Sequence, residues 1–294
     1  MSNMPKLSDQ PRTLRLLMPQ WQGGNNPAYA MGARLLAWLA PPAGETPQVE
    51  VPVEPFDGSE LPREGGVVAQ SVLLRQARSA RKIIEAYEPD RVIVFGGDCL
   101  VSQAPFAYLN ERYGGRLGVL WIDAHADVCT PEMHRHEHAM VLGNLLGEGD
   151  ASFSAEVGVP LKPECVMYAG LQETSPQVTA ILDRLKLGQA GARELAEDSG
   201  PVLKWIEEQG IEKLAIHLDL DVLDPRLFRA LLFAQPDGTV IDSPSGEMTL
   251  PQVARLIRDV SGRTEVVGLA IAEHLPWDAV NLHDFLASLP IFDK

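Results

Sequence analysis

The stretch LAIHLDLDVLDP, residues 214–225, decides the fold class of this 294-residue chain. Its first half, Leu214–Leu218, is a nearly continuous apolar run with no alternation between apolar and polar residues. Such runs are typical of strands that are buried on both faces of a parallel sheet. Its second half sets Asp219 and Asp221 directly after the predicted strand, at the edge of the sheet where ligands of α/β proteins bind.

Similar runs recur along the chain and alternate with amphipathic segments. The other predicted strands are Leu14–Met18, Arg91–Phe95, Leu117–Ile122, Cys165–Ala169 and Val266–Ile271. Apolar residues at helical spacing predict helices between them, namely Ser71–Tyr87, Pro176–Leu187, Pro201–Gln209 and a helix capped by Thr249. This alternation predicts an α/β fold with a mainly parallel central sheet.

Three segments fall outside the alternation. Residues 41–66 contain six prolines and predict an extended connection at the edge of the sheet. Residues 147–164 and 235–247 are polar and are expected to be loops. None of the three is a convincing domain linker, and no internal repeat is present. We therefore expect one domain over residues 1–294.

Composition and charge narrow the class of partner. The net charge is −15, so phosphate backbones are repelled and nucleic acid is not expected as a partner. Three cysteines cannot form a disulfide framework and suit a reducing compartment. The first residues lack the apolar core of a signal peptide, and no apolar stretch is long enough to span a bilayer. The sequence therefore predicts a soluble cytoplasmic protein without membrane association.

Metal-ligand residue types follow four of the predicted strands. Because the carboxyl ends of parallel strands share one edge of a sheet, these side chains are expected to meet in one crevice. The strands lead, in chain order, into Cys99, into Asp123 with His125 and Asp127, into Asp219 with Asp221, and into Glu273.

The spacing of these residues predicts a metal site. In an extended chain, Asp123, His125 and Asp127 would point the same way, as would Asp219 and Asp221. Carboxylates crowded in this manner repel one another, and cations relieve the repulsion. Their number exceeds the needs of one small ion, which favours two ions with shared ligands. Carboxylate and imidazole ligands favour a manganese-like ion.

Other polar residues near these strands have a structural interpretation. Asp98 and Asp224 are expected to fix turns, Asp224 together with the proline that follows it. His217 lies inside an apolar run and is expected to pack in the core rather than to bind an ion. Cys165 is expected in a core strand, and the role of Cys129 is open.

Four motifs, in this order, resemble the arginase/agmatinase (ureohydrolase) family: GGD at 96–98, DAHAD at 123–127, DLDVLDP at 219–225, and Glu273. The resemblance covers about residues 91–276. It implies a three-layer α/β/α domain with a central parallel sheet and two manganese ions per chain. It also implies hydrolysis of a guanidino or formimino carbon–nitrogen bond in a small cationic substrate, releasing urea and an amine from guanidino compounds.

The same resemblance implies roles for the metal-ligand residues. Asp123 and Asp219 would bridge the two ions. Asp127 would complete one site, and His125 with Asp221 would complete the other. The family also implies a homo-oligomer, a trimer or a hexamer.

Two further roles are implied outside the metal ligands. Glu273 matches the carboxylate that pairs with the substrate guanidinium. His138 matches the proton shuttle of the family, although His134 and His136 lie close by in the sequence and leave the choice open.

The sequence departs from the family at several positions. Cys99 stands where a histidine ligand is usual, which puts the identity or occupancy of that ion in question. Cys129 replaces an asparagine at a position implied to bind substrate. Residues 170–175 lack the aspartate that arginases use toward the α-amino group, and the segment 268–276, GLAIAEHLP, has an alanine where an aspartate is usual. Arginine is therefore not assured as the substrate.

Three alternatives remain open from the sequence alone. The first is hydrolysis of a modified guanidine, such as a hydroxyguanidine, or of a formimino compound. The second is a non-catalytic family member that only binds a ligand. The third and weakest is a metal-dependent deacylase on a related fold.

Overall fold

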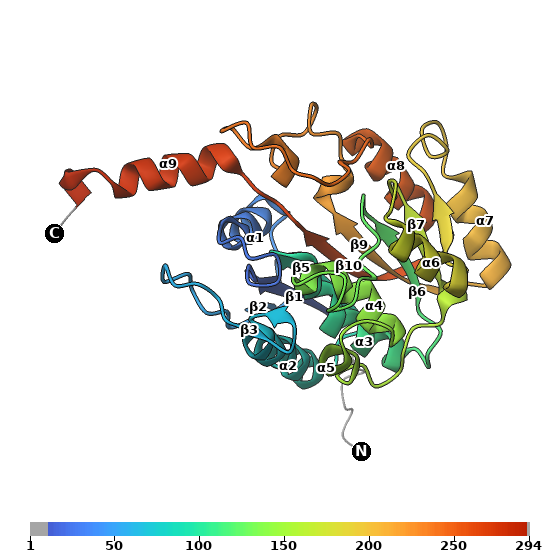
Figure 1. Cartoon of the computed structure of the whole chain (residues 1–294). Helices are drawn as coiled ribbons and strands as arrows, with labels where there is room; N and C mark the ends of the chain where they lie inside the picture. The colour runs from blue at the N-terminus through green and yellow to red at the C-terminus, as the bar shows by residue number, and fades with distance from the viewer. Residues whose placement is uncertain (1–10, 293–294) are drawn as a thin grey trace, which may run out of the picture.

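A central parallel sheet organises the computed structural model, which describes residues 11–292 (Figure 1). Its eight strands are ordered β2-β1-β5-β10-β9-β6-β7-β8, and every neighbouring pair is parallel. The strands are β1 Thr13–Met18, β2 Gln48–Glu50, β5 Arg91–Gly96, β6 Gly118–Ile122, β7 Val166–Ala169, β8 Gly188–Ala190, β9 Lys213–Asp219 and β10 Glu265–Ala272. The predicted parallel α/β fold is confirmed.

Helices cover both faces of this sheet and complete three layers. One face packs against α2 and α6 and contains the larger part of the core. The other packs against α7 and α8, with α1 beside them. The helices are α1 Ala28–Leu39, α2 Gln70–Tyr87, α3 Gln103–Arg112, α4 Val141–Leu146, α5 Ala151–Ser154, α6 Pro176–Leu185, α7 Gly200–Gln209, α8 Leu250–Ser261 and α9 Trp277–Ala287.

Local sequence signals explain the helices that were predicted. The Thr249 hydroxyl accepts from the Gln252 backbone N–H, and the Gln252 side chain bonds back to Thr249, so a complete capping box opens α8. The Ser175 hydroxyl accepts from the Val178 backbone N–H and caps α6, with Pro176 in the first turn. In α2 the buried residues fall on one stripe that faces the sheet.

The prediction of strands buried on both faces holds for some of the strands only. Strands β6 and β7 are buried at every position, whereas β1 alternates between buried and half-buried residues. Position in the sheet does not explain the difference, because β1 and β7 each have one short strand outside them, β2 and β8, and the central β10 also contains half-buried residues. The proline-rich segment contributes β2 at this sheet edge, as expected, and two short strands, β3 Arg63–Glu64 and β4 Val67–Val68, form a separate antiparallel pair.

One helix leaves the body of the molecule. After β10 the chain runs outward, and α9 projects away from the sheet (Figure 1). No residue of α9 is buried, and Leu282, Phe285 and Leu286 are exposed. Trp38 and Leu39 at the end of α1 are exposed as well. Within residues 11–292, no helix combines the length and apolar character needed to cross a bilayer.

Candidate metal centre

The carboxyl ends of four adjacent strands bring together the side chains that the motifs single out. Cys99 follows β5, Glu273 follows β10, Asp219 ends β9 and Asp123 follows β6, and these strands are neighbours in that order. The Cys99 thiol donates to Asp219 Oδ2 at 2.9 Å and lies 3.5 Å from Glu273 Oε1. Residues 174 positions apart in the chain therefore meet at one edge of the sheet.

A second group lies beside the first and shares Asp123 with it. His125 Nδ1 lies 2.9 Å from Asp221 Oδ2 and 3.7 Å from Asp123 Oδ1. The candidate ligand atoms of these three residues all lie within 4.8 Å of one another. The same limit holds for Cys99, Asp123, Asp127 and His217.

Backbone and indole donors hold the central carboxylates in place. The His125 N–H donates to Asp123 Oδ1 at 2.7 Å, and the Trp121 indole N–H donates to Asp123 Oδ2 at 2.9 Å. The Asp221 N–H donates to Asp219 Oδ1, also at 2.7 Å. Each carboxylate oxygen has two lone pairs, so these bonds leave capacity for a cation.

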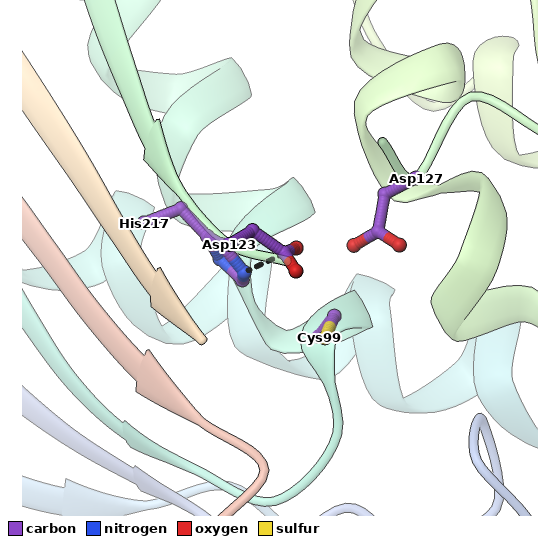
Figure 2. A group of neighbouring side chains, drawn as sticks. All are labelled: Cys99, Asp123, Asp127 and His217. Carbon is purple, nitrogen blue, oxygen red and sulfur yellow. Dashed lines mark ion pairs between the residues drawn. The ribbon is translucent and has the colours of Figure 1, made fainter. Parts of the chain in front are cut away.

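Asp127 reaches the site by a different backbone path from the one expected. The extended spacing argument is wrong here, because β6 ends at Ile122 and the chain then bends. Asp127 itself has a φ of 51°, in the left-handed region that non-glycine residues adopt mainly where surrounding structure imposes it. Figure 2 shows its carboxylate directed toward Asp123 and Cys99.

Burial concentrates negative charge in this crevice. Asp123, Asp127, Asp219 and Asp221 are all buried. Burial, followed by repulsion between the carboxylates, raises the pKa of Asp123, Asp127 and Asp219. Burial also opposes ionisation of Asp221, but His125 outweighs it and lowers the pKa of Asp221. Within residues 11–292 the ion pairs of these carboxylates involve histidines only.

His138 and Glu273 form the third group of the site. His138 Nδ1 lies 3.1 Å from Glu273 Oε1, and both lie near Cys99. Burial raises the pKa of Glu273 to about 8. Burial, with the neighbouring His134 and His136 imidazoles, lowers the pKa of His138 to about 3. A neutral imidazole in the free protein can take up a proton during a reaction and pass it on.

The neighbouring histidines do not share this contact. His134 Nδ1 bonds the backbone of His136, and the His136 ring lies beside the Arg135 guanidinium. Within the part of the chain that the structure describes, His138 is the member of the trio with a hydrogen bond to a carboxylate of the site. This geometry favours His138 over His136 for proton transfer.

His217 packs in the core as expected, and in addition one of its ring nitrogens faces the site. It is fully buried, and its ring stacks on Trp121 with centroids 3.7 Å apart. One nitrogen, Nδ1, bonds the Ser102 hydroxyl at 2.7 Å. The other, Nε2, has no hydrogen-bond partner and lies 3.8 Å from Asp123 Oδ2, so it faces the carboxylates (Figure 2).

Two contacts of the site come from residues that the sequence did not single out, Ser243 in the predicted loop 235–247 and Phe233 just before that loop. The Ser243 hydroxyl lies 2.8 Å from His125 Nε2, and the Phe233 ring stacks near the His125 ring with centroids 5.9 Å apart. No sequence signal points to these two residues. Cys129 is half-buried, and burial together with Asp127 raises the pKa of its thiol to about 11.

The residues interpreted as structural have turn-forming contacts. Asp98 accepts from the backbone N–H groups of Leu100 and Gly23, and Asp224 accepts from the backbone and guanidinium of Arg226. Cys165 lies in a single 3₁₀ turn before β7 and is half-buried, so its placement in a core strand was wrong by one residue.

Comparison with known proteins identifies the family of this chain. The model of the arginase family matches residues 47–282. Arginase 1, mitochondrial, of Arabidopsis thaliana is 24% identical over 261 residues, which are 87% of this chain and 65% of the plant protein. This chain therefore spans less than two thirds of the length of that relative.

Solved structures agree on the fold. The arginase of Entamoeba histolytica in complex with L-ornithine superposes with a TM-score of 0.75 at 18% identity, covering 90% of each chain. Proclavaminate amidino hydrolase from Streptomyces clavuligerus gives 0.66 at 18% identity, covering 90% of this chain and 84% of its own. With its matched span of 47–282 and the strand-end cluster that the fold assembles within it, this chain belongs to the arginase family.

Proposed function

We propose that this protein is a hydrolase that uses two divalent cations to cleave a carbon–nitrogen bond in a small cationic guanidino compound, releasing urea and an amine. The observation that carries the proposal is the pair of ligand groups that share Asp123. One group contains Cys99 and Asp127, and the other contains His125 and Asp221. A shared carboxylate between two ligand sets is the arrangement that two-metal hydrolysis uses.

The chemistry of the donor set supports cation binding. Asp127 Oδ2 is buried without a hydrogen-bond partner, and buried carboxylates that lack a counter-charge are costly. Asp123 and Asp219 would bridge the ions, Asp127 and Cys99 would complete one site, and His125 and Asp221 the other. Carboxylate and imidazole ligands suit Mn²⁺, which we expect at least in the His125 half. Bound cations would supply charge stabilisation and a nucleophile derived from water near neutral pH.

The remaining residues would handle the substrate and its protons. Glu273 would accept charge-assisted hydrogen bonds from the cationic substrate group, which would offset the burial of its own carboxylate. His138, 3.1 Å from Glu273, would give a proton to the leaving amine. Cys129 would lie close to the bound substrate, as the motif implies.

Residues outside the metal ligands narrow the choice of substrate within this reaction class. Residues 170–175 read GLQETS and have no aspartate for an α-amino group, which disfavours arginine. The structural likeness to an amidino hydrolase with a different named substrate supports the view that this fold accepts several amidino compounds. Hydroxyguanidines and formimino compounds are the alternatives to be tested beside unmodified guanidines.

The test combines metal analysis with a substrate panel. Wild-type protein grown with manganese is expected to hold about two ions per chain and to release urea from one guanidino compound. Asp221→Ala is expected to lose metal and turnover, whereas Asp242→Ala, in an exposed loop, keeps both. Full activity of Asp221→Ala would refute the two-metal proposal. Absence of both metal and turnover in the wild type would favour a ligand-binding protein.

We also propose that the protein forms a homo-oligomer. The apolar residues of α9 face solvent in the single chain, and so do Trp38 and Leu39 of α1, next to it. Exposed apolar patches of this kind mark interaction surfaces. A trimer or hexamer remains the expectation from the family, and cytoplasmic localisation remains a prediction from the sequence.

A further inference from the structure

We infer that the His217 imidazole is itself a metal ligand, bound through Nε2 to the same cation as Cys99 and Asp127. This inference rests on the proposed two-cation centre and assigns a residue to it that no motif includes. It makes this half of the centre a thiolate–imidazole–carboxylate site, selective for a borderline cation such as Zn²⁺ or Co²⁺ over Mn²⁺.

The distances fit shared coordination better than a hydrogen bond. His217 Nε2 lies 3.8 Å from Asp123 Oδ2, beyond hydrogen-bond distance. Two ligand atoms that are each about 2.1 Å from one cation lie roughly 3.0–4.2 Å apart. The Cys99 thiol and the Asp127 carboxylate belong to the same group, in which all candidate ligand atoms lie within 4.8 Å. Figure 2 shows the four side chains around one space.

The packing of His217 orients its free nitrogen. Its Cα pairs with that of Trp121 in the register of β6 and β9, which explains the stacked rings, with an interplanar angle of 10°. Nδ1 bonds the Ser102 hydroxyl at 2.7 Å. A metal-bound histidine almost always donates its other ring N–H to an oxygen, which fixes the tautomer. With Ser102 as that acceptor, the lone pair of Nε2 points into the carboxylate crevice.

A role in packing alone does not account for this arrangement. His217 is fully buried, yet Nε2 has no hydrogen-bond partner. A buried polar nitrogen without a hydrogen-bond partner destabilises the folded state. A role as a simple ion-pair partner of Asp123 would bring Nε2 within hydrogen-bond distance, which 3.8 Å is not. A bound cation satisfies Nε2 and the unpartnered Asp127 Oδ2 together.

The ligand types set the metal preference. Soft thiolate ligands select Zn²⁺ over Mn²⁺, and imidazole suits Zn²⁺, whereas carboxylates suit Mn²⁺. The Cys99–His217 half contains one thiolate and one imidazole, and the His125–Asp221 half contains an imidazole and carboxylates. The two halves are therefore expected to prefer different ions.

The first experiment titrates the protein with Co²⁺ and records its absorption spectrum. Wild type is expected to bind two ions per chain and to show a sulfur-to-cobalt charge-transfer band from Cys99. His217→Asn keeps a polar amide near the position of Nδ1 but removes Nε2 and the ring that stacks on Trp121, and it is expected to weaken one site at least 10-fold and to alter the visible bands. Thermal melting of the metal-free variants checks the fold, and Ser102→Ala, which keeps the imidazole, is expected to weaken the site less.

The outcomes separate this inference from the proposed function. Two ions per chain with an unchanged affinity and spectrum in His217→Asn would overturn the inference and leave the hydrolase proposal standing. No metal in the wild type would overturn both. Wild-type protein dialysed against equal Zn²⁺ and Mn²⁺ is expected to retain Zn²⁺ beside Cys99, and retention of Mn²⁺ alone would refute the preference.

A second measurement uses the wild-type protein, so it does not depend on whether a variant folds. In a crystal structure of the zinc-loaded wild type, the anomalous signal locates the ion. Zinc about 2.1 Å from His217 Nε2 is the expected result. Zinc bound by Cys99 and the carboxylates, with His217 Nε2 more than about 3 Å away, would overturn the inference.

Discussion

Cys99 places a thiol among four buried carboxylates, and in the proposed centre this thiol would be a metal ligand. The Cys99 Sγ atom is 2.9 Å from Asp219 Oδ2. Burial, and then repulsion by the carboxylates, holds the pKa of the thiol far above its usual value. A cation reverses this balance, because a coordinating thiol is deprotonated by the metal. Metal binding at Cys99 should therefore release a proton.

Exchange of this ligand should change the metal preference. Cys99→His replaces a soft ligand with an imidazole, so we expect the variant to keep two ions and to bind Mn²⁺ more tightly than the wild type. Equilibrium dialysis with Mn²⁺ and Zn²⁺ measures the shift. Cys165→Ser, before β7 and away from the cluster, serves as the control. A large loss of metal in Cys99→His would contradict the placement of Cys99 among the ligands.

Glu273 is expected to act on the substrate rather than on the metals. Glu273→Gln keeps the shape of the side chain and its contact with His138 but removes the charge. A lost charge-assisted hydrogen bond of about 1.5–3 kcal/mol corresponds to a roughly 10–150-fold fall in kcat/KM. Metal content should not change. Glu265→Gln, at the opposite end of β10, is the control, and unchanged kinetics in Glu273→Gln would exclude the proposed role.

At the scale of elements, close contacts between backbone segments fix the loops that follow the strands. The Glu273 N–H donates to the Gly97 carbonyl at 2.7 Å, and Glu273 has a φ of 63°. A Cβ at Gly32 in α1 would lie 1.8 Å from the His274 carbonyl oxygen, so glycine is required there. Helix α1 thus packs directly on the turn that presents Glu273.

The short helix that carries His138 is anchored by a buried acid. Glu137 Oε1 accepts from the Asn144 amide at 2.6 Å, while Glu137 Oε2 is buried without a partner. Burial raises the pKa of Glu137 from 4.5 to about 8. The folded state therefore favours the neutral acid, and the stability that this acid contributes is complete below pH 4.5 and is lost as the pH rises to about 8.

This linkage predicts a pH-dependent effect of one substitution. Glu137→Gln keeps the acceptor for Asn144 and cannot ionise. The change that it causes in the free energy of unfolding should therefore be more favourable at pH 8 than at pH 5, by at least about 1 kcal/mol. Urea denaturation of the metal-free protein at both pH values measures the difference. Glu132→Gln, exposed in the same loop, should show no such difference. An equal effect of Glu137→Gln at both pH values would contradict the raised pKa of Glu137 in the folded state.

At the scale of the whole molecule, α9 projects from the body (Figure 1), and the single chain leaves an apolar surface of α9 uncovered, together with apolar side chains at the end of α1. If a second copy covers it, Leu282→Glu with Phe285→Glu should produce a smaller species. Light scattering coupled to gel filtration measures the mass, with a trimer or hexamer expected for the wild type. Leu250→Glu, an exposed leucine on α8, is the matched control. A monomeric wild type, or an unchanged mass in the double variant, would refute the proposal.

Secondary structure could be predicted where the local signal was strong. The six long strands and the helices with caps or clear stripes were placed to within a few residues. Helix α3 was missed because it is buried on nearly all sides and has no amphipathic stripe. Helix α1 was missed because Pro27 precedes it and provides no side-chain cap, and because its terminal turns have no charged residue. The edge strands β2 and β8 are too short to show a pattern.

The sequence by itself determined the parallel α/β fold and the chemistry of the strand ends. Buried parallel strands need continuous apolar runs, and their carboxyl ends must share one edge. Only the tertiary structure decided which way the His217 ring nitrogens face, because a histidine inside an apolar run looks the same in sequence whether both its nitrogens are satisfied or one faces a crevice. Its orientation depends on Trp121 and Ser102, which lie on other segments of the chain. The contact of Ser243 with His125 likewise joins residues 118 positions apart, a pairing that only packing can set.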